Sequence, residues 1–129
     1  MESKPPTAAQ QLVVFWVLWA AFLGGVCVQY FFLQNKKPPA GDETSAWIAA
    51  VLPVVVSIII RWNVLPRAQT ATQALPLMIV GIALAESTVF LGIFLFPAHQ
   101  WELFLAAFFG IAQHAPVYAQ RWGSPPPNS

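Results

Sequence analysis

The chain has 129 residues, of which 57% are hydrophobic and 9% are charged, and its mean hydropathy is +0.61. Soluble domains average about 25% charged residues, so this sequence has too few charges to cover a water-facing surface. Six Lys and Arg residues against five Asp and Glu residues give a net charge of +1, without the basic stripe typical of nucleic-acid binding. The composition excludes an ordinary cytosolic domain, a disordered chain and a nucleic-acid-binding protein, and it indicates a membrane protein.

Long uncharged runs predict transmembrane helices, because a spanning helix needs about 20 mainly apolar residues. The first run, residues 7–34, is expected to be a retained anchor, since its apolar core is too long for a signal peptide and no small-x-small cleavage site follows. The second run, residues 44–63, has Thr44 as a candidate N-cap and Pro53 as an expected kink. Its Val and Ile residues would suggest a strand in water, but an isolated strand cannot satisfy its backbone in lipid.

The remaining two runs predict helices at residues 73–96 and 98–121. Pro76 falls in the first turn of the third helix, Pro97 ends it, and Pro116 falls near the last turn of the fourth. The tryptophans at predicted helix ends, where indole rings prefer the headgroup region, are Trp47, Trp62, Trp101 and Trp122. We therefore expect an all-α polytopic membrane protein, an up-down bundle of four transmembrane helices over residues 7–122, with disordered tails at 1–6 and 123–129.

The positions of the basic residues predict the orientation. With four spans, both termini share a side with the loop at residues 61–74. The basic residues of that side are Lys4, Arg61, Arg67 and Arg121, and those of the other side are Lys36 and Lys37. Because Lys and Arg are enriched in cytoplasmic loops, we expect a multi-pass protein of the cytoplasmic membrane with both termini inside.

Glu86 is the one ionisable residue near the middle of a predicted span. A charged carboxylate there costs at least about 2.5–3.5 kcal/mol, so a functional role is the default hypothesis, and we expect the group to be protonated or paired. His114, about one turn nearer the cytoplasm, is the candidate partner in an ion-binding pair. Two alternatives stay open: Glu86 bonds a carbonyl or polar side chain of a neighbouring helix, and His114 lies near the wet end of its own. The other polar candidates are Cys27, Gln29, Ser57 and Gln113.

Small residues recur at helical spacing and are typical of close helix contacts in membranes. The candidate helix-packing residues are Gly24, Gly25, Gly81, Ala85, Gly92 and Gly110. Packing within one chain is the preferred interpretation, and oligomerisation is the alternative.

Catalytic motifs are absent from the sequence, which has no G-x-S-x-G, H-E-x-x-H, phosphate-binding glycine loop or C-x-x-C. Cys27 is the only cysteine, and His99 and His114 are about 22 Å apart along one predicted helix, too far to bind one metal. We expect no enzymatic activity, no metal and no cofactor.

Residues 67–92 resemble the carboxylate-bearing helix of the c subunit of rotary ATP synthases. The resemblance rests on Arg67-Ala68-Gln69, on the stretch MIVGIALAE that ends at Glu86, and on Gly92. In that family a basic Arg-Gln loop precedes a helix with a small-residue stripe, whose mid-membrane carboxylate binds the translocated proton or sodium ion. The resemblance implies that Glu86 is an ion-binding carboxylate and that Arg67 and Gln69 form the polar loop.

The sequence thus favours a small integral membrane protein without catalytic activity, with a structural or accessory role. Its expected partners are the lipid bilayer and either further copies of itself or a larger membrane complex, with no nucleic acid. The alternative is proton or cation handling through Glu86, in an oligomer.

Overall fold

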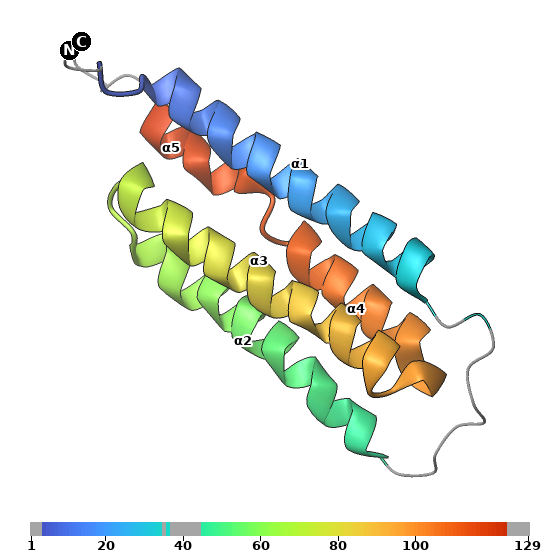
Figure 1. Cartoon of the computed structure of the whole chain (residues 1–129). Coiled ribbons are helices and arrows are strands. Elements are labelled where there is room, and N and C mark those ends of the chain that lie inside the picture. The colour runs from blue at the N-terminus through green and yellow to red at the C-terminus, as the bar shows by residue number, and fades with distance from the viewer. Residues whose placement is uncertain (1–3, 35, 37–44, 124–129) are drawn as a thin grey trace.

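The computed structural model describes residues 4–34, 36 and 45–123, and this part of the chain is helical without strands. Its elements are α1 (Ala8–Leu33), η1 (Ser45–Val51), α2 (Leu52–Ile59), η2 (Ile60–Val64), η3 (Leu65–Arg67), α3 (Ala71–Phe94), η4 (Pro97–His99), α4 (Gln100–Ala112), η5 (Pro116–Ala119) and α5 (Gln120–Gly123). The helices lie side by side along one long axis (Figure 1). Among the described residues, three segments are long and apolar enough to cross a membrane: Ala8–Leu33, Ser45–Arg67 and Ala71–Phe94.

The start of α1 is defined by a capping box. The Thr7 side chain accepts a hydrogen bond from the Gln10 backbone N–H at 3.2 Å, and the Gln10 side chain accepts one from the Thr7 backbone N–H at 2.8 Å. Both contacts satisfy amide groups that a helix N-terminus leaves without intrahelical partners. The observed helix agrees with the predicted span 7–34 to within one residue at each end.

The second segment is a continuous helical stretch whose winding changes along its length. It is a 3₁₀-helix to Val51, an α-helix from Leu52, a π-helix over Ile60–Val64 and again 3₁₀ to Arg67. The first change coincides with Pro53, which lies in the first turn of α2, a position where proline is tolerated. The segment extends beyond the predicted end at residue 63. The predicted N-cap Thr44 lies outside the described residues, as do tail residues 1–3 and 124–129.

The third helix begins at Ala71, earlier than the predicted residue 73. The Thr70 side chain caps it by accepting a hydrogen bond from the Gln73 backbone N–H at 3.2 Å. Pro76 therefore lies inside α3 rather than in its first turn, which corrects the prediction.

The predicted continuous helix over residues 98–121 is wrong, because the chain leaves the helical path before Pro116. Proline has no N–H to bond the carbonyl of Ala112, and its ring would collide with that carbonyl. The preceding residue, Ala115, is extended with ψ 124°, the conformation that a following proline favours. The chain therefore forms α4, a short break, the 3₁₀-helix η5 and the short helix α5, which lies beside α1 (Figure 1).

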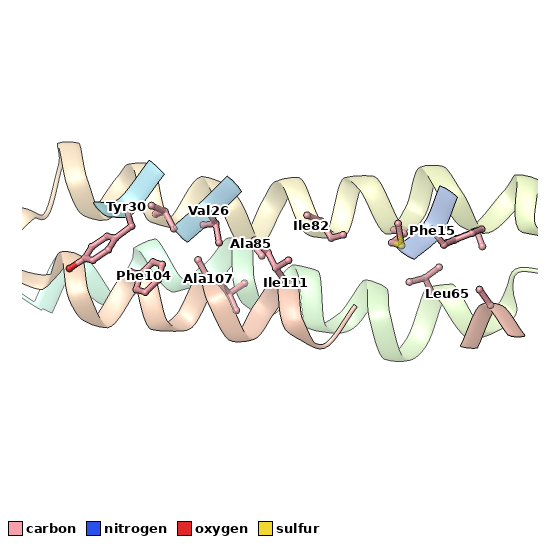
Figure 2. Packing of buried hydrophobic residues seen from close by; sticks show 14 of the residues in the cluster. Phe15, Val26, Tyr30, Leu65, Ile82, Ala85, Phe104, Ala107 and Ile111 are labelled. Carbon is pink, nitrogen blue, oxygen red and sulfur yellow. The ribbon is translucent and has the colours of Figure 1, made fainter. Parts of the chain in front are cut away.

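The core lies where α3 meets α4 and α2, and small residues allow these helices to approach closely. A Cβ atom on Gly110 would lie 2.9 Å from Cβ of Ala85, and one on Gly92 would lie 3.0 Å from Cβ of Leu103. Figure 2 shows Ala85, Ala107 and Ile111 along this seam, with the stacked rings of Tyr30 and Phe104 towards one end. Gly92 and Gly110 thus make close contacts within the described part of the chain.

Gly24 and Gly25 of α1 are different. A Cβ atom on either would have no described atom within 4 Å. Only three of the 26 residues of α1 are buried, namely Phe15, Val26 and Tyr30. Gly24 and Gly25 are thus not needed for close helix contacts within the described part of the chain.

We expect Gly110→Ala to destabilise the protein by about 1–3 kcal/mol, because the new methyl group would press on Ala85 and Val54. Gly24→Ala is the matched control, and we expect it to be neutral or stabilising, because alanine has the higher helix propensity. Thermal unfolding of both variants in one detergent measures the difference. Equal unfolding midpoints would contradict the close contact between α3 and α4.

Candidate functional site

The break in the fourth helix exposes backbone carbonyls, and side chains from two other helices bind them. Trp19 of α1 donates a hydrogen bond from Nε1 to the Ile111 carbonyl at 3.0 Å. Arg61 of the π-helix donates from Nε to the Gln113 carbonyl at 2.8 Å. The Ile111 carbonyl also accepts from the His114 backbone N–H at 3.0 Å. A carbonyl without a partner in an apolar environment costs several kcal/mol, so the Arg61 contact compensates for the interrupted helix at Gln113.

His114 lies inside this break and is fully buried, at 0% exposure. Its Nε2 and the hydroxyl oxygen of Ser57, also fully buried, are 2.9 Å apart and share a hydrogen bond. The imidazole packs directly on α3, where a Cβ atom on Gly81 would lie 2.5 Å from Cε1 of His114. Gly81 provides the space for the ring, so the small residue and the histidine form one arrangement.

The π-helix directs two consecutive side chains to the same residue. Arg61 bonds the Gln113 backbone carbonyl, and Trp62 donates from Nε1 to the Gln113 side-chain oxygen at 2.9 Å. The Arg61 guanidinium also lies 4.4 Å from the centre of the Trp62 ring and 4.7 Å from that of Tyr118. A π-helix has more residues per turn than an α-helix, so the angle between successive side chains is smaller. Single π turns are frequent at functional sites.

We call Trp19, Ser57, Arg61, Trp62, Gln113, His114 and Tyr118 the helix-break cluster. It is near the middle of the bundle, because Gly81 lies about 15 Å along an α3 helix about 36 Å long. Several of its buried polar atoms have no hydrogen-bond partner among the described residues, namely Gln113 Nε2, His114 Nδ1 and Tyr118 Oη. These three atoms can therefore form further hydrogen bonds that no described residue supplies.

Glu86 lies outside the helix-break cluster. It is half-buried on α3, and it has no hydrogen bond or ion pair with any described residue. Ala85, the residue before Glu86, contacts Gly110, which is one helical turn before His114. His114 itself contacts Gly81 and Ser57, on another face of α3 from Glu86. The structure does not bring Glu86 and His114 together. Ion binding at Glu86 stays a prediction.

Sequence reasoning noted Ser57, Gln113 and His114 as polar residues within spans, but missed the roles of Trp19 and Arg61. The expected position of Arg61 was the cytoplasmic loop, because the second helix was predicted to end at residue 63. A proline near the end of an apolar run was the available signal, since it marks carbonyls that need other donors. Among the described residues, no three His, Cys, Asp or Glu side chains come together as a metal site.

No protein-family model matches the chain, and no curated protein or solved structure is significantly similar to it. The assignment of function therefore depends on the arrangement of this chain's own residues.

We expect Ser57→Ala to destabilise the protein by about 1–3 kcal/mol, because it leaves the buried His114 Nε2 without its partner. Ser87→Ala is the matched control, since the Ser87 hydroxyl donates only to the Leu84 carbonyl of its own helix. Unfolding midpoints in detergent measure both. If the two serine variants lose equal stability, the Ser57–His114 contact does not hold α2 to the fourth segment.

Proposed function

We propose that this chain is a small integral membrane protein without catalytic activity, acting as a structural or accessory component of the cytoplasmic membrane. In this proposal the segment from α4 through α5 is the fourth span of an up-down bundle, with both termini in the cytoplasm. The observation that carries the proposal is the separation of polar and apolar groups. The polar groups of the helix-break cluster bond between helices, whereas the outer faces carry exposed Val, Ile, Leu and Phe residues.

Those outer faces favour a lipid environment over water. Exposed apolar side chains occur on all three long helices, for example Val17 at 60%, Leu52 at 61% and Phe94 at 66%. Monomeric soluble proteins rarely expose continuous apolar surface of this kind. In a bilayer the same side chains contact acyl chains without cost.

An accessory role is supported by the exposed side of α1. Small exposed residues in the middle of this helix are Ala20, Ala21 and Gly24, and no described atom occupies the space beside Gly24. Small residues of this kind allow another membrane helix to approach closely. We propose that a helix of a second copy or of a larger complex packs there.

We expect the wild type purified in mild detergent to elute as a homo-oligomer or with other subunits, and Gly24→Leu to elute as the 14.2 kDa chain alone. The added side chain blocks close approach but meets no described atom within its own chain. Val80→Leu, at a half-exposed position on α3, is the matched control and should keep the wild-type assembly. Size-exclusion chromatography with light scattering reports the mass.

Alkaline carbonate extraction separates the two parts of this proposal. All three proteins should stay in the membrane pellet, as integral proteins do. If the wild type stays in the pellet but elutes as a monomer in detergent, only the proposal of a partner helix is wrong. If it is extracted into the supernatant, the proposal of membrane insertion is wrong.

The alternative function is proton or cation handling through Glu86. Its support is the position of the carboxylate about 22 Å along α3, half-buried and with no bonded partner in the described part of the chain. A carboxylate within a span is by default a functional candidate. In this alternative a group of another subunit, or a bound cation, completes the site.

Decay of a pH gradient in proteoliposomes distinguishes the two functions. The accessory role predicts that vesicles with wild type, vesicles with Glu86→Gln and empty vesicles decay at equal rates. Faster decay with the wild type, returning to the rate of empty vesicles with Glu86→Gln, would replace the accessory role by ion handling. Ser87→Ala serves as the control for a polar change next to Glu86.

A further inference from the structure

A basic pocket of about 540 Å³ lies where η3 leads into α3. Its lining includes Arg67, Gln69, Arg121 and Trp122. Arg121 is fixed in place: it donates from Nη2 to the Ala68 carbonyl at 2.6 Å, and its guanidinium lies 4.4 Å from the centre of the Trp122 ring. Trp122 in turn donates from Nε1 to the Gln69 carbonyl at 3.0 Å. The pocket is thus a built part of the fold.

The positive charge of this pocket has no counter-charge in the described structure. Arg67 is exposed and forms no hydrogen bond or ion pair with a described residue. The carboxylates in the described ranges are Glu86, deep in α3, and Glu102, which contacts His99 at the other end of the bundle. Two guanidinium groups without a nearby carboxylate favour an anionic ligand, above all a phosphate.

An apolar groove of about 420 Å³ is linked to the basic pocket by an aromatic contact. It lies between the first turns of α1 and α3, and its lining includes Val14, Phe15, Ala71 and Leu75. The Phe15 ring stacks on Trp122 of the basic pocket, with 6.0 Å between the ring centres. The stacked Phe15–Trp122 pair therefore connects the lining of the apolar groove with that of the basic pocket.

We propose that the pocket and the groove together bind one anionic phospholipid, with the phosphate at Arg67 and Arg121 and an acyl chain along the groove. The arrangement matches the chemistry of a lipid, since the charged and apolar parts are linked at the ends of membrane-spanning helices. In the proposed membrane arrangement Trp122 is at the end of the fourth span, where indole rings prefer the headgroup region. Basic pockets at the cytoplasmic ends of spans recognise anionic headgroups. The inference rests on the proposed membrane location and adds a specific lipid to it.

The test is native mass spectrometry of the full chain in mixed micelles. The probes are phosphatidylglycerol and phosphatidylcholine with identical acyl chains. We expect preferential retention of phosphatidylglycerol by the wild type and about fivefold lower retention by Arg67→Gln, the effect of one basic residue near an anionic surface. Lys36→Gln removes an exposed charge outside the pocket and is the matched control, with retention unchanged.

The variant Val14→Phe tests the groove without changing charge. It should reduce phosphatidylglycerol retention to a similar extent, because the larger ring occupies the space of the acyl chain. If Val14→Phe has no effect while inorganic phosphate competes with the lipid, the pocket binds free phosphate and the lipid proposal is wrong. Equal retention of both lipids by wild type and Arg67→Gln would also overturn it, leaving only non-specific surrounding lipid.

Carbonate extraction keeps this result separate from the proposed function. A protein that stays in the membrane pellet but shows no lipid preference lacks the lipid site and keeps its membrane location. A protein that is extracted fails the membrane proposal, whatever lipid it retains in micelles.

Discussion

The missing N–H of Pro116 is the constraint on which the centre of the structure depends. It ends α4 at Ala112 and turns the chain off the helical path, so that the Ile111 carbonyl keeps only a short-range bond from the His114 N–H at 3.0 Å. Side chains of other segments donate to the carbonyls at this break: Trp19 of α1 adds a second bond to Ile111, and Arg61 of the π-helix bonds Gln113. One proline thereby explains why three separate segments meet at a single level of the bundle.

The helix-break cluster also explains the irregular winding of the second segment. A regular α-helix would turn Trp62 further from the direction of Arg61, whereas the π-helix lets both reach Gln113. Ser57, one turn earlier, faces the buried His114, which needs the space beside Gly81. The π-helix, the break after α4 and Gly81 of α3 thus all belong to one arrangement around Gln113 and His114. The cluster is held mainly by neutral hydrogen bonds, and its one cation bonds a carbonyl, which limits the cost of polar groups inside an apolar bundle.

The sequence was sufficient for the features that depend on one segment at a time. Hydropathy placed the first and third helices to within two residues at each end, because length and apolar content decide whether a segment can span. Hydropathy did not predict the features that depend on contacts between two segments. Whether Pro116 ends a helix or only bends it depends on donors from other helices, so the predicted span 98–121 missed the break. Residue spacing predicted the positions of Glu86 and His114 along the helix axes. It could not predict which face of α3 turns towards the fourth segment, and that face carries Gly81 and not Glu86.

The attachment of α1 connects the fold with the proposed role. This helix is held at one end by Phe15 stacked on Trp122, further along by Trp19 on the Ile111 carbonyl, and at the other end by Tyr30 stacked on Phe104. Between the last two contacts lie Gly24 and Gly25, with no described atom of another element beside them. Aromatic residues thus fix the helix to its own chain, while its small residues stay uncovered. A helix needed only for the internal core would bury these glycines, as α3 and α4 bury theirs. The division along α1 therefore favours a second helix from outside the chain, which is what an accessory membrane component requires.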